Sequence, residues 1–286
     1  GAAVVKNFAT LALAVADTGL VDGDSINLAE RTTGNGGGAM WDVVLSSDVT
    51  ENTFNIVQCT GVGTLSLVLR DTGIVDPKAW GATGDNSTDD QAALQVVLTN
   101  AGTIEFSAGT YIHNTALALA STTELIFTEG ATLKYTGSAV ANGLTGSSLT
   151  GLRFVNMAME GSGEATGFSN VQLTSCTDVL FENCDISKSG SMGIYLISCI
   201  GVRTVNCNLH NNYFYGIEDK LGVSNKHTGN RCYENGETGT NTGTGGRGIN
   251  VWRGTDIEVS GNSLKDNTEY GFRLYSEAGD ASPTTG

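Results

Sequence analysis

Short runs of alternating hydrophobic and polar residues dominate the second half of the chain. Residues 171–186, VQLTSCTDVLFENCDI, align with residues 194–209, IYLISCIGVRTVNCNL, with 6 identities in 16 positions at an offset of 23. Alternation with a period of two is typical of strands that bury one face. The runs are too short for paired helices, and Asn and Gly stand between them. The pattern therefore predicts three short strands in each 23-residue unit.

The repeat continues toward the C-terminal end with one change of spacing. Gly193 corresponds to Gly216, Gly248 and Gly271, at offsets of 23, 32 and 23. The extra nine residues fall within residues 234–247, a Gly- and Thr-rich stretch in which we expect a surface loop that either borders a groove or has no role in binding.

A fixed period built from short strands is typical of a solenoid. The predicted fold is all-β: a right-handed parallel β-helix with three short strands per rung and rungs about 4.8 Å apart. Leucine-rich repeats fit less well, because they need a helix in each unit. Weaker turns precede the clear ones. Their paired positions are Ile104/Phe106, Leu125/Phe127, Leu152/Phe154 and Val179/Phe181, the last three pairs at offsets of 27.

The net charge of the chain narrows the classes of molecule that it is expected to bind. The chain has 15 basic and 30 acidic residues, a net charge of −15, which disfavours nucleic acid and an anionic membrane surface as partners. Hydrophobic residues make up 40% of the chain, enough for a core, but no apolar stretch is long enough to cross a bilayer.

Four of the six cysteines recur at equivalent positions of neighbouring rungs: Cys176 with Cys199, and Cys184 with Cys207. No CxxC pair occurs, so a zinc ribbon is not expected. We expect buried thiols that pack as small apolar groups, with disulfides between rungs as the alternative. We predict no cofactor and no metal ion.

Two kinds of polar residue are expected at bends. Asn183 and Asn206 are predicted to adopt the left-handed conformation and to stack. Thr88 and Gln91 match a T-x-x-Q capping box, which predicts a helix near residues 89–100 that covers the N-terminal end of the solenoid. Three nearby carboxylates are expected to form turns and the helix start, with a metal site as the alternative: Asp85, Asp89 and Asp90.

Residues 76–137 resemble the entry segment of the pectate-lyase-like β-helix superfamily. The resemblance rests on WGATGDNSTDDQAALQ, GTIEFSAGTYIHNTALAL and ELIFTEGATLKYTG. Residues 8–44 resemble a small domain that precedes this β-helix in phage tail proteins, with Asn35 in place of the usual Asp. The matching positions are Phe8, Thr10, Leu11, Gly23, Asp24, Gly36, Gly37, Gly38 and Trp41.

Together the two segments resemble a bacteriophage tailspike or tail fibre depolymerase. The resemblance implies a small head or attachment domain over residues 1–75, a β-helix over 76–275 and a C-terminal tail over 276–286. The last rung is incomplete, so we expect either that the natural chain continues or that a partner covers this end. The resemblance also implies a homotrimer in the virion tail, made in the host cytoplasm, which contacts other tail proteins through its N-terminal domain.

The activity that the resemblance implies is binding and depolymerisation of a bacterial surface polysaccharide, by hydrolysis or β-elimination. The polysaccharide would be a capsule, an O-antigen or an exopolysaccharide. A non-catalytic glycan-binding protein and a structural tail component are the alternatives. Catalytic positions vary within the superfamily, so no catalytic residue is transferred.

The repeat itself predicts which side chains face outward. One outward column runs Gln172, Tyr195, Glu218, Asn250, Arg273, and the next runs Thr174, Ile197, Lys220, Trp252, Tyr275. Aromatic rings stack on sugars, while amides and charged groups bind hydroxyls and carboxylates. We therefore expect a glycan platform on this face, with a trimer interface or a plain outer wall as the alternatives. Its expected substrate-binding residues are Tyr195, Asn250, Trp252, Arg253, Arg273 and Tyr275.

Glu218, Asp219 and Lys220 are the catalytic candidates. The repeat turns Asp219 inward, where desolvation would raise its pKa and suit a general acid; alternatively, a bulge turns Asp219 out and Leu221 in. Hydrolysis needs two carboxylates, roughly 5 Å or 6.5–9.5 Å apart, and Asp256 and Glu258 are weaker partners. Elimination needs a base and a cation, for which Lys220, Arg253, Arg273, His210 and Tyr213 are available.

Overall fold

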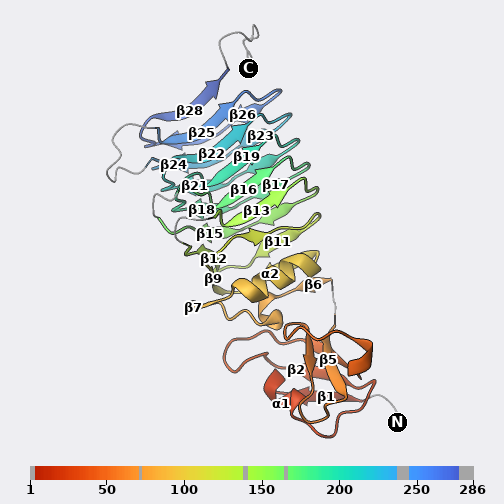
Figure 1. Cartoon of the computed structure of the whole chain (residues 1–286). Coiled ribbons are helices and arrows are strands. Elements are labelled where there is room, and N and C mark those ends of the chain that lie inside the picture. The colour runs from red at the N-terminus through yellow and green to blue at the C-terminus, as the bar shows by residue number, and fades with distance from the viewer. Residues whose placement is uncertain (1–3, 71–72, 138–140, 164–166, 237–244, 277–286) are drawn as a thin grey trace.

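The computed structural model describes residues 4–70, 73–137, 141–163, 167–236 and 245–276. Most of the chain winds into a tall stack of turns, and a small unit built from the N-terminal residues lies at its lower end (Figure 1). Among the described residues, no helix is both long and apolar enough to cross a membrane.

Three parallel sheets form the sides of the stack. Sheet 1 has seven strands, β10 (Leu117–Ala118), β13 (Leu144–Ser147), β16 (Val171–Thr174), β19 (Ile194–Ile197), β22 (Tyr215–Lys220), β25 (Arg247–Trp252) and β28 (Tyr270–Tyr275). Sheet 2 has eight, β6 (Ile74–Val75), β8 (Thr103–Phe106), β11 (Glu124–Phe127), β14 (Arg153–Val155), β17 (Leu180–Glu182), β20 (Arg203–Val205), β23 (Lys226–Thr228) and β26 (Glu258–Ser260). Sheet 3 has eight, β7 (Asp85–Asp89), β9 (Gly109–His113), β12 (Ala131–Tyr135), β15 (Ala158–Glu160), β18 (Asp185–Ser187), β21 (Asn208–His210), β24 (Arg231–Tyr233) and β27 (Ser263–Lys265).

The strand register confirms the predicted repeat. Leu173 pairs with Leu196, and both are fully buried. In the outward column of the same sheet, Tyr195 pairs with Glu218, Glu218 with Asn250, and Asn250 with Arg273. The single 32-residue step is absorbed between β24 and β25, and the central part of the expected loop there, residues 237–244, lies outside the described residues.

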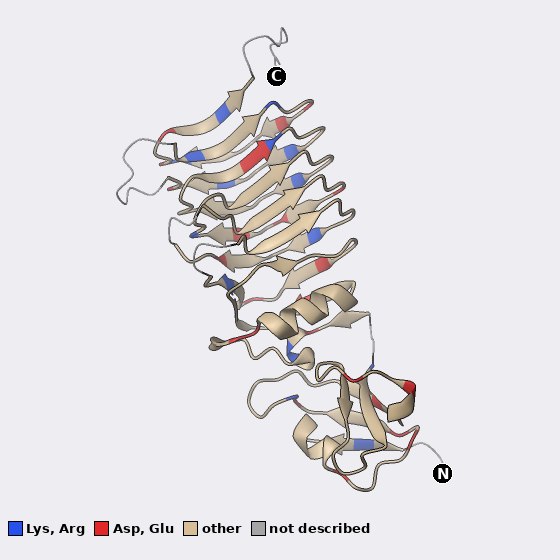
Figure 2. Cartoon of the chain, viewed as in Figure 1, with Lys and Arg blue, Asp and Glu red and all other residues tan. Residues whose placement is uncertain are grey.

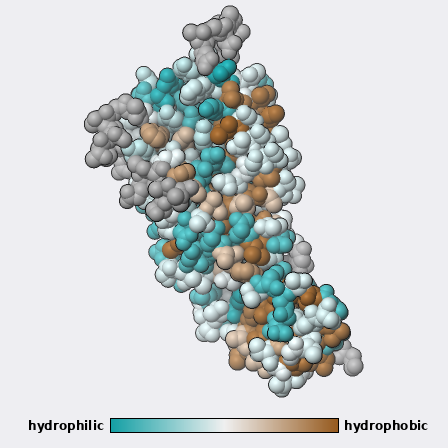
Figure 3. Space-filling model, in the orientation of Figure 1, coloured by the Kyte–Doolittle hydropathy of each residue, from teal (hydrophilic) through white to brown (hydrophobic). Residues whose placement is uncertain are grey.

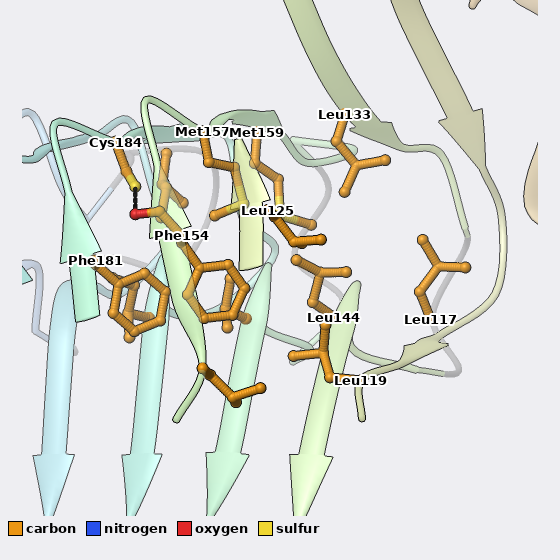
Figure 4. Packing of buried hydrophobic residues seen from close by; sticks show 14 of the residues in the cluster. Leu117, Leu119, Leu125, Leu133, Leu144, Phe154, Met157, Met159, Phe181 and Cys184 are labelled. Carbon is orange, nitrogen blue, oxygen red and sulfur yellow. Dashed lines mark hydrogen bonds between the residues drawn. The ribbon is translucent and has the colours of Figure 1, made fainter. Parts of the chain in front are cut away.

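Hydrophobic side chains from the three sheets meet inside the solenoid (Figure 4). Phe154 stacks on Phe181 with ring centroids 4.4 Å apart and planes 7° apart. Leu125 pairs with Phe154, so the expected pairing with Leu152 is wrong by two residues. Sheet 1 keeps its 27-residue step at this point, because Leu117 pairs with Leu144. The shift therefore comes from two extra residues in the turn that leads from β13 to β14.

All six cysteines, which lie in the described part of the chain, are buried and form no disulfide. This confirms the prediction of buried thiols. The Sγ of Cys184 lies 3.4 Å from the carbonyl oxygen of Phe154 on the preceding turn (Figure 4).

Asparagine side chains bond to the backbone of the preceding turn inside the later turns of the solenoid. The side-chain oxygen of Asn235 accepts from the backbone N–H of Asn212 at 3.2 Å, and its amide nitrogen donates to the carbonyl of Leu209 at 3.0 Å. Asn267 repeats both contacts one turn further on. Asn225, Asn230 and Asn262 form the same pair of contacts in two other columns.

The predicted asparagine stack is therefore misplaced. Asn183 and Asn206 do adopt positive φ, 54° in each case. The asparagine side chains that form a ladder from turn to turn lie instead in the interior columns. There each amide supplies a hydrogen-bond partner for a buried backbone N–H at a bend.

A helix covers the N-terminal end of the solenoid, as predicted. It is α2 (Gln91–Asn100), which buries Ala93, Leu94, Val97 and Leu98 against the first turns. The 3-10 helix η2 (Pro77–Trp80) packs beside it.

The predicted capping box does not form. The helix begins after Asp90, two residues later than the box requires, so Thr88 is not the N-cap residue. The Thr88 hydroxyl donates instead to Asp85 at 2.8 Å. The Asp90 carboxylate accepts from the backbone N–H groups of Thr83 and Gly84 at 2.6 and 3.1 Å, so these acids stabilise the turn before the helix.

The N-terminal unit has its own five-stranded mixed sheet and its own core around Trp41. In spatial order its strands are β1 (Val5–Phe8), β2 (Ser25–Leu28), β3 (Met40–Leu45), β5 (Leu65–Leu69) and β4 (Ile56–Gln58), with α1 (Leu11–Val15) and the 3-10 helix η1 (Ser46–Asp48) at its edges. Arg31 donates to the carbonyl oxygens of Phe54 and Ala79 at 2.5 and 2.6 Å, and so connects this unit to η2. Gly37, at φ 74°, packs where a Cβ would lie 2.5 Å from the Lys78 backbone, which explains the glycine turn.

The inward residues of the last strand are partly exposed. Phe272 and Leu274 on β28 keep 42% and 48% of their surface accessible. Figure 3 shows hydrophobic residues at the surface of these last turns. The expected C-terminal tail, apart from Ser276, lies outside the described residues.

Candidate functional site

The outward face of β19, β22, β25 and β28 presents the predicted columns side by side. Within β22 the side chains of Glu218 and Lys220 point outward while Ile217 and Asp219 point inward, because successive residues of a strand face opposite ways. Parallel pairing places Asn250 and Trp252 beside the two outward residues. Figure 2 shows acidic and basic segments next to each other on these strands.

Aromatic rings and cations share the second outward column. Trp252 is 37% exposed and meets Tyr275 edge to face, with ring centroids 5.1 Å apart. The ammonium of Lys220 lies 5.0 Å from the Trp252 ring centre, and the guanidinium of Arg273 lies 5.4 Å from the Tyr275 ring centre. Such contacts hold each cation beside an aromatic surface on which a sugar can stack.

Glu218 is the buried acid of this face. Its side chain accepts a hydrogen bond from Asn250 at 3.2 Å, and the residue is only 5% exposed. Burial raises the pKa of the Glu218 carboxyl, and the bond from Asn250 and the charges of Lys220 and Arg247 oppose this shift only in part. A carboxyl with a raised pKa holds its proton longer as the pH rises, as a general acid must.

A third group, at the start of these strands, was not predicted. Arg247 donates to the Tyr215 hydroxyl at 2.6 Å and forms an ion pair with Glu269 at 2.7 Å. Its guanidinium lies 4.8 Å from the ring centre of Tyr215 and 6.0 Å from that of Tyr270.

The sequence does contain a signal for this group. Tyr215, Arg247 and Tyr270 pair in register, and each residue comes directly before one of the repeated glycines. They form a third column that the alternation rule does not reveal, because their side chains gather at the end of the strands rather than along their outward face.

Two buried polar atoms at this site have no hydrogen-bond partner among the described residues, Oδ1 of Asn250 and Nε of Arg247. One is an acceptor and the other a donor. Asn250 pairs with Glu218 in register, whereas Arg247 pairs with Tyr215 and acts on Glu218 through its charge.

Two of the expected binding residues, Tyr195 and Arg253, lie at the margin of the surface formed by the two outward columns. Tyr195 neighbours Glu218 in the first column, and burial, followed by the negative charge of Glu218, raises its pKa. Arg253 follows the last residue of β25 at φ 55° and donates its backbone N–H to the carbonyl of Tyr275 at 2.8 Å. It therefore lies beyond the two columns.

Asp219 points into the solenoid and is fully buried. Its Oδ2 lies 3.1 Å from Nε2 of His227 and accepts from Asn225 at 3.0 Å. Leu221 is 39% exposed, so the alternative in which a bulge turns Asp219 outward is wrong. The inward orientation is confirmed, but it removes Asp219 from the outer face, and a catalytic role for it there does not fit the structure.

The weaker candidates lie elsewhere. Glu258, on sheet 2, pairs with Lys226 at 3.0 Å, and Asp256 accepts from Ser224 at 3.0 Å. His210, on sheet 3, lies 3.1 Å from Asp185. Among the residues that the structure describes, no group of three or more His, Cys, Asp or Glu side chains could hold a metal ion.

A family model described as a right handed beta helix region matches residues 169–284. The fold is a right-handed parallel β-helix. The search of curated proteins found no match.

Solved structures with this β-helix include phage tailspikes. The chain is 13% identical to tailspike protein 2 of Escherichia coli O157:H7 bacteriophage CAB120, with a TM-score of 0.62 over 94% of this chain and 42% of that one. It is 17% identical to the tailspike protein of Acinetobacter phage vB_ApiP_P1, with a TM-score of 0.63 over 96% of this chain and 56% of that one. The chain thus spans about half the length of these tailspikes.

The β-helix of a polysaccharide-modifying enzyme is also similar. The A-module of mannuronan C-5 epimerase AlgE4 from Azotobacter vinelandii is 16% identical, with a TM-score of 0.53 over 70% of this chain and 74% of that module. The predicted resemblance to phage tailspikes is confirmed at the level of the fold, and the pectate-lyase-like description is supported only by this general likeness.

Proposed function

We propose that the protein is a tailspike-like protein that binds a bacterial surface polysaccharide on the outward face of β22, β25 and β28. The observation that carries the proposal is the exposed Trp252 ring, packed against the half-buried Tyr275 ring, on the same face as the buried Glu218 carboxyl. Exposed rings with hydrogen-bonding groups around them match the amphipathic faces of a sugar chain. The tailspike folds that the chain resembles support this reading.

We propose further that the bound glycan is cleaved here. In hydrolysis, Glu218 would give its proton to the glycosidic oxygen as the bond from that oxygen to the sugar carbon breaks, and water would add to the carbon. Glu269, held by Arg247, is the second carboxylate of this surface and would take the proton from that water. In β-elimination, a base would instead remove a proton beside a uronic acid carboxylate.

Binding without cleavage is the second candidate. The low exposure of Glu218 and its hydrogen bond to Asn250 favour it, because both features also suit a carboxyl that only shapes the surface.

At the level of the whole protein, we propose a homotrimer in the virion tail that attaches to other tail proteins through the N-terminal unit. The mixed sheet of that unit and its own core are consistent with an attachment domain.

The test is a Glu218→Gln variant incubated with surface polysaccharides from a panel of candidate hosts. Cleavage by the wild type, followed through new reducing ends and through the ultraviolet absorbance of unsaturated ends, should fall by about 10²- to 10⁴-fold in the variant. Binding should persist. Glu258→Gln on sheet 2 is the matched control and should cleave normally. Binding without either product from the wild type would establish the second candidate.

A further inference from the structure

Outward cations on sheets 2 and 3 generally pair with an acid on a neighbouring turn of the solenoid. Among the described residues, the Lys and Arg ion pairs between neighbouring turns of these sheets are Arg153–Glu124 at 3.1 Å, Arg203–Asp178 at 3.9 Å, Lys226–Glu258 at 3.0 Å, Lys134–Glu160 at 3.9 Å and Lys188–Glu160 at 3.1 Å. Lys265 pairs with the adjacent Asp266 at 3.1 Å. With 30 acidic residues against 15 basic ones, partners are plentiful.

On sheet 1, Arg247 at the start of β25 also has an acidic partner, Glu269, but the two cations of the outward columns differ. Lys220 and Arg273 form no ion pair with any residue that the structure describes, and aromatic rings hold both of them. Arg231, over Tyr233, is a similar cation, but it lies on sheet 3 and so outside this surface.

The two cations bracket the glycan platform. Lys220 pairs in register with Trp252, and Arg273 pairs with Asn250, so one cation stands on each side of the central strand β25. A sugar stacked on Trp252 or Tyr275 would bring its substituents next to a cation that has no carboxylate partner of its own.

We infer that the polysaccharide bound here is acidic, and that Lys220 and Arg273 bind its carboxylates. The inference rests on the proposed glycan-binding function and adds the charge class of the ligand. A guanidinium donates two parallel hydrogen bonds to a carboxylate, and an ammonium binds it as a point charge. On a chain with a net charge of −15, an acidic glycan would be repelled unless it met positive groups at its binding surface.

The experiment compares each host polysaccharide that binds the wild type with the same polymer after chemical reduction of its carboxyl groups. The wild type should bind the reduced polymer at least tenfold more weakly. A Lys220→Gln/Arg273→Gln double variant should bind the native polymer as weakly as the wild type binds the reduced one, and should lose little more when the polymer is reduced. Lys226→Gln on sheet 2 is the matched control and should bind as the wild type does.

Melting temperatures of all variants would show that each one folds. Undiminished binding of the reduced polymer, or of the native polymer by the double variant, would overturn the inference and leave the proposed function intact. Failure of the wild type to bind any polysaccharide of the panel would overturn the proposed function and the inference with it.

Discussion

Glu218 and Asp219 are adjacent in sequence, yet their carboxylates lie on opposite sides of one strand. Glu218 faces outward beside Asn250, whereas Asp219 faces inward beside His227. Each carboxylate therefore has a distinct role. We assign Glu218 to the polysaccharide surface and Asp219 to the stability of the interior.

The raised pKa of Glu218 predicts a pH-dependent stability. Between its ordinary pKa of 4.5 and its raised value, the folded protein binds more protons than the unfolded chain. Stability from this group is therefore present at low pH and is lost as the pH rises through that window. Glutamine cannot titrate, so the unfolding free energy of the wild type relative to Glu218→Gln should fall from acidic to neutral pH. Urea unfolding of both proteins across that range measures it, and a difference that grew with pH would contradict the assignment.

Asp219 should matter for folding rather than for glycan contact. Asp219→Ala leaves His227 and Asn225 without their buried partner and should destabilise the protein by about 3–5 kcal/mol. The double variant Asp219→Leu/His227→Val restores the apolar residue types of neighbouring turns and should recover most of that loss. Unfolding experiments measure both effects. Full stability of Asp219→Ala would contradict the account.

At the scale of strands and turns, interior asparagines fix the geometry of the last bends. The Asn235 side chain accepts from the backbone N–H of Asn212 and donates to the carbonyl of Leu209. Removing this side chain therefore leaves two buried backbone groups unpaired.

Asn235→Ala should therefore lower the unfolding free energy by about 1–3 kcal/mol. Asn100→Ala, at the exposed end of α2, should change it by less than about 0.5 kcal/mol. Chemical unfolding of the two variants and the wild type measures both free energies. Equal losses in the two variants would show that the interior asparagines stabilise the fold no more than an exposed one does.

The strands could be predicted from sequence because alternation of hydrophobic and polar residues reports which side chains are buried. The fixed offset between repeats reports which strands are neighbours. The end cap at α2 followed from its amphipathic pattern and its place before the first turn. The capping box failed because Thr88 found a nearer acceptor in Asp85. Two extra residues in one turn shifted the pairing of Leu125, and nothing in the local alternation records such an insertion.

At the scale of the molecule, the repeat predicted which side chains share a face, because the register of a β-helix turns sequence offsets into neighbours in space. The repeat aligns Tyr215, Arg247 and Tyr270, but it could not predict the contacts of Arg247, which depend on side-chain reach across a strand end. It also could not show that Glu218 is buried on an outward face, which depends on how the surrounding side chains pack.

The central claim is that the polysaccharide lies across β22, β25 and β28, and tryptophan fluorescence tests it directly. Trp41 and Trp80 are buried, at 0% and 5% exposed, whereas Trp252 is 37% exposed. Acrylamide should therefore quench mainly Trp252. Saturation with a polysaccharide that binds should protect it, and the protection should vanish in Trp252→Phe. Binding that leaves the quenching of Trp252 unchanged would place the glycan elsewhere and contradict the account.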